Sequence, residues 1–182
     1  MTRIYIHNLS RIKDSDLASL TDVIAKIFLV PVYVHHLALN FEEAYDGVRG
    51  QYSSSILLSQ LLSNGLLPET KHIVIVDVDL FIPILTFIYG EAQFEGQAAI
   101  VSMHRLNNEF YGLGPNSVVL YERLQKEIVH ELGHTFGLYH CRQFECVMRS
   151  STYVEEIDLK RVTLCPDCDK SLREKSPLQL AT

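Results

Sequence analysis

The hydrophobic positions near the start of the chain follow two different periods. Residues Arg3 to Leu9 alternate isoleucine with polar neighbours, which predicts a strand with one buried face. Apolar residues then recur at intervals of three and four, so residues 15–28 are expected to form an amphipathic helix. Val32 to Leu39 is β-branched and aromatic and predicts a second strand. This order favours a right-handed crossover between two parallel strands.

The next segment changes from polar to continuously apolar. Asn40 to Tyr52 is polar, contains two glycines and is expected to be a loop. Ser53 to Ser55 can cap a second helix, which should end near Asn64 and Gly65. Lys71 to Val78 is almost continuously apolar, and this predicts a central strand that is covered on both faces.

Two further strands and one long helix complete this pattern. Phe87 to Phe94 and Gln97 to Met103 predict the strands, one of them at the edge of the sheet. Asn107 to Asn116 contains two glycines and a proline and is expected to be a loop, after which Asn116 or Ser117 caps the helix. One side of this helix is predicted to be buried through the stripe Leu120, Leu124, Ile128, Leu132 and Phe136.

The composition is that of a globular protein with one domain, which could have two lobes. The 182 residues are 47% hydrophobic and 21% charged. The net charge is −6 without a basic stripe, so nucleic acid is not an expected partner. The apolar region from Ile73 to Tyr89 is interrupted by Asp77, Asp79 and Pro83, so no membrane span is predicted. The first residues lack the apolar segment of a secretory signal, and we expect a cytoplasmic protein.

One motif carries chemistry: the run from His130 to His140 reads HELGHTFGLYH. On a helix, His130 and His134 point in directions about 40° apart and lie one turn apart, so both can bind one cation. In a continuing helix, His140 would lie about 240° round from His134 and about 9 Å further along. Gly137 can end the helix, because glycine readily adopts the left-handed conformation, and the chain can then bring His140 back.

Three neutral imidazoles are ligands that suit zinc and leave its fourth position open. A bound zinc ion lowers the pKa of its water molecule and polarises a carbonyl oxygen. Glu131 lies beside the histidines and would act as the general base. The alternative is a chance match in which His130 and His134 are buried core residues, and the added Gly137 and His140 disfavour it.

All four cysteines follow this motif, as two chelating pairs with the spacings CX4C and CX2C, formed by Cys141, Cys146, Cys165 and Cys168. This arrangement resembles a structural zinc site, in which four thiolates close the coordination shell. Disulfides, redox chemistry and unpaired thiols are the alternatives, although an intracellular chain disfavours disulfides. Because Cys141 directly follows His140, we hypothesise that this second site anchors the backbone that presents the third histidine.

These motifs together resemble the metzincin zinc proteases. The metzincin pattern is matched by His130, Glu131, His134, Gly137 and His140, and Met148 matches the methionine that metzincins place in a tight turn beneath the metal. The cysteine pattern after His140 is similar to that of one subgroup, the archaemetzincins, which bind a second zinc ion through four cysteines. A methionine in this position would also be explained by ordinary core packing, as a hydrophobic floor.

The resemblance implies an α+β fold with a twisted mixed sheet of about five strands. It places the active-site helix in an N-terminal lobe, residues 1–137, and the methionine turn and the four-cysteine zinc site in a C-terminal lobe, residues 138–182. An edge strand, here Phe87 to Phe94, would hold an extended peptide by β-addition. Some metzincins carry a tyrosine two residues after the turn methionine, where this chain has Ser150; Tyr153 is nearby, but the resemblance does not extend to it.

We therefore expect a zinc-dependent metallopeptidase with two zinc ions, peptide or protein substrates and a monomeric state. The alternative is a zinc-containing module that binds peptides with weak or no hydrolysis, which Ser150 favours. A zinc site with a downstream glutamate as its third ligand is a weaker alternative, because His140 has the metzincin spacing.

Overall fold

The fold is built on a five-stranded mixed sheet in a computed structural model that describes residues 2–175. The last part of the predicted C-terminal lobe, residues 176–182, lies outside the described residues. The strand order is β2-β1-β5-β8-β7, with the bounds Val32–Val34, Arg3–Leu9, Thr70–Val76, Ala98–Ser102 and Gly90–Ala92. The first four strands run parallel, and β7 lies antiparallel to β8 at one edge.

The sheet confirms the predicted positions of its central and edge strands. β5 occupies the middle of the order and pairs with β1 from Arg3–Thr70 to Leu9–Val76. Its segment from Ile73 to Val76 is buried on both faces, which explains why the sequence there is continuously apolar. β7 lies within the predicted range of Phe87 to Phe94, but it is shorter.

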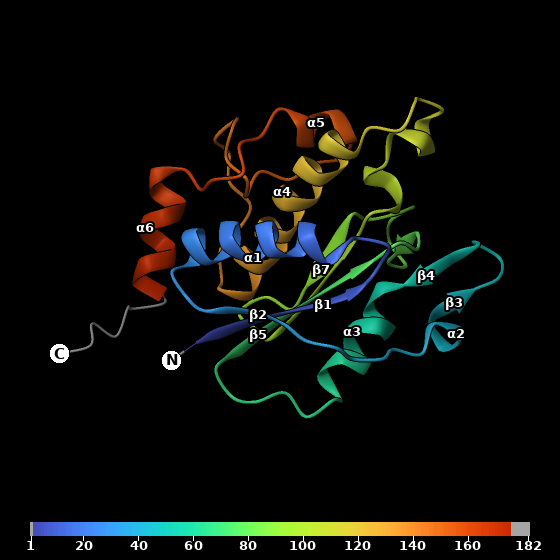
Figure 1. Cartoon of the computed structure of the whole chain (residues 1–182), viewed down its shortest axis with the longest axis horizontal. Helices are drawn as coiled ribbons and strands as arrows, with labels where there is room; N and C mark the ends of the chain where they lie inside the picture. The colour runs from blue at the N-terminus through green and yellow to red at the C-terminus, as the bar shows by residue number, and fades with distance from the viewer. Residues whose placement is uncertain (1, 176–182) are drawn as a thin grey trace.

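Helices cover both faces of the sheet (Figure 1). α1 (Asp14–Phe28) and α4 (Ser117–Thr135) pack on one face, where their leucines and isoleucines meet Ile4, Ile6, Ile73 and Ile75. α3 (Ser54–Leu62) packs on the opposite face. The alternation of β1 therefore has its predicted role: its isoleucines enter the larger core.

The strand predicted over Val32 to Leu39 is wrong beyond Val34. β2 pairs with β1 for three residues, and the last ladder bond runs from the His35 amide to the carbonyl of Ile6. The chain then leaves the sheet, and Leu37 and Leu39 pack against the smaller core beneath α3. The hydrophobic character of this segment therefore reflects packing rather than pairing.

The loop predicted over Asn40 to Tyr52 is also wrong in part. It contains α2 (Phe41–Ala44), which Asn40 caps by accepting hydrogen bonds from the amides of Glu42 and Glu43. A hairpin follows, formed by β3 (Tyr45–Asp46) and β4 (Gln51–Ser53). β4 then pairs with β6 (Leu80–Phe81) in a second, three-stranded sheet.

Two predicted helix starts are confirmed by their caps. The Ser53 side chain accepts a hydrogen bond from the Ile56 amide at the start of α3, which ends slightly earlier than predicted. The Asn116 side chain accepts one from the Val119 amide at the start of α4. The preceding predicted loop includes a short 3₁₀ turn, η2 (Asn108–Tyr111), and another, η1 (His104–Leu106), comes just before it.

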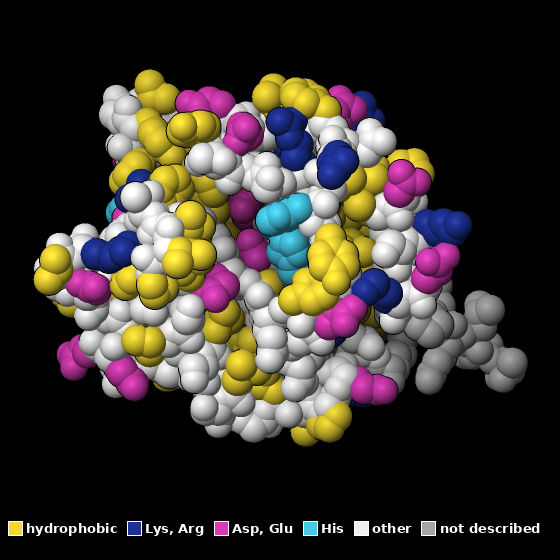
Figure 2. Space-filling model, turned by 180° about the vertical axis from the view of Figure 1, so that it is seen from behind, with side chains coloured by type: hydrophobic (Ala, Val, Ile, Leu, Met, Phe, Trp, Pro, Cys, Tyr) yellow, Lys and Arg dark blue, Asp and Glu magenta, His cyan; other side chains and the backbone are white. Residues whose placement is uncertain are grey.

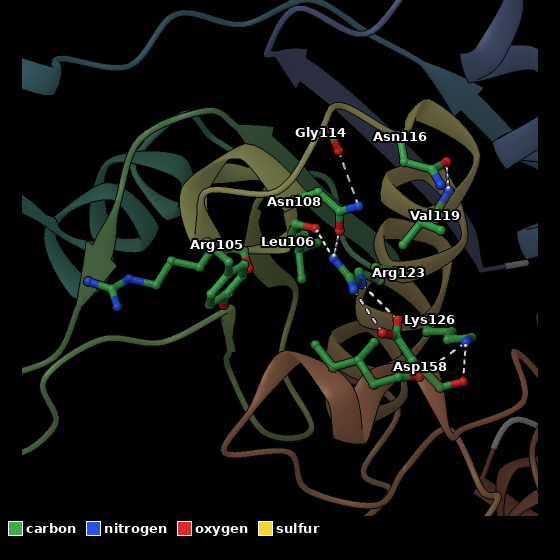
Figure 3. Close-up of polar contacts among 11 residues, drawn as sticks. Arg105, Leu106, Asn108, Gly114, Asn116, Val119, Arg123, Lys126 and Asp158 are labelled. Carbon is green, nitrogen blue, oxygen red and sulfur yellow. Dashed lines mark hydrogen bonds and ion pairs between the residues drawn. The ribbon is translucent and has the colours of Figure 1, made fainter.

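The C-terminal segment is attached to α4 by buried polar contacts (Figure 3). Arg123 pairs through two nitrogens with the carboxylate of Asp158 and also donates to the carbonyl of Leu106. Lys126 donates to the last carbonyls of α5 (Val154–Asp158). α6 (Pro166–Lys175) reaches α1 through a bond from Arg173 to the Ile27 carbonyl. None of the helices in residues 2–175 is long and apolar enough to cross a membrane.

Candidate metal centre and active site

Helix α4 has two faces of different character. Leu124, Ile128 and Leu132 are completely buried in the larger core. A polar stripe at intervals of three and four occupies another face, formed by Glu127, His130, Glu131 and His134. The helix thus holds two histidines and a glutamate on a rigid element that packs against β5, β7 and β8.

The helix ends at Thr135, and Gly137 forms the turn after it, which brings back the third histidine as predicted. Gly137 has a φ of +83°, in the left-handed region. Its amide donates to the carbonyl of His134, and the amide of Leu138 donates to the carbonyl of Gly133. These two bonds form a Schellman motif, which reverses the chain immediately after the helix. His140 follows three residues after Gly137 and faces the helix again.

The three imidazoles converge. The ligand nitrogens of His130, His134 and His140 all lie within 4.8 Å of one another. The Nε2 atoms of His130 and His134 are 3.1 Å apart. Nitrogens that share a tetrahedral zinc ion would be roughly 3.3 Å apart, because Zn–N bonds are about 2.0–2.1 Å long. The spacing therefore fits one small cation.

The surroundings of the histidines hold them in the neutral form that binds metals. His130 donates from Nδ1 to the carbonyl of Val147, and His134 donates from Nδ1 to the carbonyl of Leu138. These bonds leave both Nε2 atoms as acceptors that face the common point. Burial lowers the pKa of all three histidines, that of His130 most strongly, and the ammonium group of Lys160 adds to this effect.

Glu131 is buried beside this cluster. Burial raises the pKa of its carboxyl well above the usual value, and the carboxylates of Glu127 and Glu91 raise it further. The edge strand packs directly on it: a Cβ atom at Gly90 would lie 2.7 Å from Cγ and 2.8 Å from Oε1 of Glu131. Glycine at this position therefore allows β7 to approach the carboxyl closely.

Met148 lies beneath the helix. It is fully buried, and it packs so closely against Gly133 that a Cβ atom there would collide with its sulfur atom. Its carbonyl accepts a hydrogen bond from the amide of Cys141. The methionine is thus part of the hydrophobic packing beneath α4, and its place under a metal ion stays a prediction.

The four cysteines meet in a second cluster. Their sulfur atoms all lie within 4.8 Å of one another, and Cys141 and Cys165 are 3.7 Å apart. All four are free cysteines. Four sulfurs around a zinc ion at about 2.3 Å would be roughly 3.8 Å apart, so the cluster also fits zinc. Burial raises the pKa of the Cys146 and Cys168 thiols, so a cation is needed to hold them as thiolates near neutral pH.

A buried ion pair lies next to the polar stripe. Lys160 and Glu127 are separated by 3.6 Å, and their side chains are 1% and 5% exposed. Neither Glu127 Oε1 nor Lys160 Nζ has a hydrogen-bond partner among the described residues. The sequence does not indicate this pair, because Lys160 approaches α4 only through the attachment of α5 at Arg123 and Lys126.

The histidine cluster opens to the surface. In Figure 2, histidine side chains appear near the middle of the face shown, beside acidic side chains in a hollow and next to hydrophobic side chains. His140 is exposed, whereas His130 is 5% exposed. Ser150 and Tyr153 are both exposed, and Tyr153 has no hydrogen bond to the three histidines among the described contacts. The histidine cluster is thus accessible from one side.

The mixed sheet, the histidine-bearing helix and its glycine turn define a zinc metallopeptidase. A sequence profile of Peptidase family M54 matches residues 40–174. The chain belongs to this family.

Curated relatives support this assignment over most of the chain. An archaemetzincin from Methanocaldococcus jannaschii is 40% identical over 134 residues, which cover 72% of both chains. An archaemetzincin from Archaeoglobus fulgidus is 33% identical over 171 residues, which cover 94% of this chain and 99% of the relative.

Solved structures share the fold. The archaemetzincin from Methanopyrus kandleri has a TM-score of 0.83 and 32% identity, with 96% of this chain and 95% of that chain covered. A zinc-dependent peptidase from Methanocorpusculum labreanum has a TM-score of 0.82 and 29% identity, with coverages of 93% and 99%. The expected α+β fold and the resemblance to the archaemetzincins are confirmed.

Proposed function

We propose that the protein hydrolyses peptide bonds at a zinc ion held by His130, His134 and His140, with Glu131 as the general base. One observation carries this proposal: the ligand nitrogens of three imidazoles lie within 4.8 Å of one another, and two of these imidazoles stand on the helix face that also holds Glu131. The family supplies the reaction class, zinc-dependent peptide hydrolysis.

Each residue of the site has a separate role in the proposed reaction. A zinc ion bound by the three histidines supplies the Lewis acid. Glu131 accepts a proton from the attacking water molecule and later delivers it to the leaving amine. Its buried position against Gly90 holds the carboxyl in place and excludes bulk solvent on that side. The carbonyls of Val147 and Leu138 orient His130 and His134 and increase their basicity.

The second cluster is proposed to hold a structural zinc ion through Cys141, Cys146, Cys165 and Cys168. Four thiolates leave no open coordination position for a reacting water molecule. The cluster connects the loop after His140 to the start of α6. A protein loaded at both sites would contain two zinc ions.

The substrate is proposed to lie along β7 as an added antiparallel strand. Tyr89 and Gln93 use their backbone groups to bond β8 on one side of the strand. Because bonding alternates along a strand, Gly90 and Ala92 direct their backbone groups to the open side. A peptide paired there would pass the carboxyl of Glu131, which touches Gly90.

The test is the variant Glu131→Gln. It keeps the size of the side chain but cannot take a proton, so we expect kcat to fall by roughly 10²- to 10⁴-fold. Zinc content, measured by atomic emission, should remain at the wild-type value. The matched control is Glu122→Gln, because Glu122 is an exposed carboxylate on the same helix. Turnover by Glu131→Gln at the wild-type rate would exclude the proposed base.

A peptide-binding module with weak hydrolysis is the second candidate. The exposed Ser150 at the position where some metzincins place a tyrosine favours it, because the serine removes one group that could stabilise the transition state. A peptide library incubated with zinc-loaded protein separates the two functions. Two zinc ions per chain, retained peptides and no cleavage products would support the binding module.

A further inference from the structure

We propose that Phe94 and Tyr139 form a subsite for a large apolar or aromatic side chain of the substrate, on the amino side of the scissile bond. The inference rests on the proposed function and specifies the class of peptide that this site would select.

The two rings form an exposed aromatic pair. Their centroids lie 4.5 Å apart with an angle of 35° between the ring planes. Phe94 is 41% exposed and Tyr139 is 72% exposed, and neither ring belongs to a core of the fold. Single exposed aromatic residues need no explanation, but an adjacent pair presents a continuous apolar surface that is available to a ligand.

Both rings are held by ordered backbone. Phe94 lies in the turn between β7 and β8, where the amide of Glu95 donates to the carbonyl of His134 at the end of α4. The side chain of Glu95 pairs with Lys175 of α6. The backbone is hydrogen-bonded on both sides of Tyr139. Before it, the amide of Leu138 donates to the carbonyl of Gly133, and after it, the amide of Cys141 donates to the carbonyl of Met148. A ligand would therefore meet a preformed surface.

Each residue of the pair lies close in sequence to a part of the candidate active site. Tyr139 directly precedes His140, a proposed metal ligand, and Phe94 comes two residues after the end of β7. Figure 2 shows hydrophobic side chains immediately beside the histidines on the open face of the molecule. A peptide that pairs with Gly90 and Ala92 would thus reach the pair without leaving the strand conformation.

The direction of pairing gives the position of the subsite. A peptide antiparallel to β7 has its amino-terminal residues opposite the later residues of β7. Gly90 touches Glu131, and Phe94 lies four residues further along the chain. Since a strand advances about 3.4 Å per residue, the selected side chain should lie roughly two to four residues before the scissile bond.

The chemistry of the pair selects the side chain. An aromatic ring or a branched aliphatic group of the substrate can pack against Phe94 and Tyr139 together and remove both rings from water. A small side chain would leave the two rings hydrated. Glu95 is already paired with Lys175, so the ion pair beside Phe94 offers no single unpaired charge to attract a charged side chain. We therefore expect phenylalanine, tyrosine, leucine or methionine in preference to glycine, aspartate or lysine.

The experiment profiles cleavage of a mixed peptide library by zinc-loaded wild-type protein and identifies the cleavage sites by mass spectrometry. We expect enrichment of large apolar residues at one position before the cleaved bond. Two peptides that differ only at that position, phenylalanine or glycine, are then assayed individually. Tyr139→Ala and Phe94→Ala should each raise KM for the phenylalanine peptide about 10-fold without changing its kcat. Neither variant should change KM or kcat for the glycine peptide. Tyr139→Phe should retain the preference.

Tyr45→Ala is the matched control, because Tyr45 is 50% exposed and packs against Tyr52 in the second sheet. This variant should leave KM and kcat unchanged for both peptides. Cleavage without enrichment of apolar residues, or an equal loss on both peptides in Tyr139→Ala, would overturn the subsite and leave the proposed function standing. A zinc-loaded wild-type protein that cleaves no peptide would overturn both.

Discussion

The two candidate metal centres lie on neighbouring parts of the chain but are built in different ways. Two ligands of the histidine centre are on α4, which packs against the sheet and has a largely buried face. The cysteine centre uses Cys141 and Cys146 from a segment without helix or strand, Cys165 just before α6, and Cys168 from the first turn of α6. The first centre is carried by a long helix of the core, whereas the second joins a segment without helix or strand to the N-terminal end of α6.

This difference matches the chemistry that each centre can perform. Carbonyl groups orient His130 and His134, and one side of the centre stays open to the surface. Four sulfurs enclose their own centre. An accessible metal site therefore needs a rigid scaffold, because its ligands alone do not enclose the ion, while a closed site can itself order the chain around it.

The largest expected effect, loss of a whole metal ion, comes from Cys165→Ser, which tests whether the two centres depend on each other. Loss of one thiolate should remove the ion from the cysteine centre and reduce the zinc content from two ions to one per chain. The segment after His140 would then lose its anchor, and we expect zinc affinity at the histidine centre to fall at least 10-fold. Titration with a chromophoric chelator measures this affinity.

A control separates coupling from general damage. Ser59→Ala replaces a hydroxyl on α3, on the opposite face of the sheet, and should leave both affinities unchanged. An unchanged affinity of the histidine centre in Cys165→Ser would show that the centres are independent, despite the adjacent positions of His140 and Cys141.

The second prediction concerns pH. Burial lowers the pKa of the three histidines, so at pH 7 they are already neutral and zinc binding displaces no proton from them. Burial raises the pKa of Cys146 and Cys168, so each must release a proton to bind zinc. Zinc affinity of the cysteine centre, and the stability that it contributes, should therefore fall at least about 100-fold per pH unit as the pH decreases near 7, because each displaced proton contributes about 10-fold.

Single-site variants allow each affinity to be measured alone. His134→Ala isolates the cysteine centre, and Cys165→Ser isolates the histidine centre. Competition with a chelator at pH 6.5 and 7.5 should give a steep dependence for the first and a nearly flat one for the second. Equal slopes would show that the two centres release the same number of protons when they bind zinc.

The smallest effect is expected from Gly90→Ala, which disturbs the wall of the histidine centre without removing a proposed ligand. A methyl group there would collide with the side chain of Glu131 and with the backbone carbonyl of Ile100, so β7 would also have to shift. We expect kcat to fall about 10-fold as the carboxyl is displaced, while both zinc ions remain bound. In this background the shorter side chain of Glu131→Asp should relieve the part of the collision that involves the carboxyl, but not the contact with the Ile100 carbonyl. The double variant should therefore lose somewhat less activity than the two single changes combined predict.

Much of the scaffold could be predicted because the apolar residues of each element recur with the spacing of a single kind of secondary structure. The alternation of β1, the continuous apolar run of β5 and the helical spacing of α1 and α4 each report a buried face. The segment from residue 35 to residue 52 could not be predicted in this way. Leu37 and Leu39 pack against a core without pairing as a strand, and the cap at Asn40 was the one local signal of α2.

The histidine and cysteine clusters were also predictable, since ligands on one helix or in chelating pairs are close in sequence. The residues that surround them were not. Gly90 contacts Glu131 across 41 positions, and Lys160 reaches Glu127 across 33. Such contacts arise from the packing of β7 and α5 on α4, for which a single sequence offers no pattern.

The carbonyls that orient the histidines have a consequence for biosynthesis. A ribosome completes α4 first, with Glu131 and two of its histidines in place. Leu138, His140 and Val147 follow, and Cys168 arrives last of the ligand residues. A nascent chain therefore carries an incomplete histidine cluster until Val147 has been translated, and an incomplete cysteine cluster until Cys168 follows. The order of residues along the polypeptide thus delays assembly of both candidate centres until the strands and the helix α4 that support them have been made.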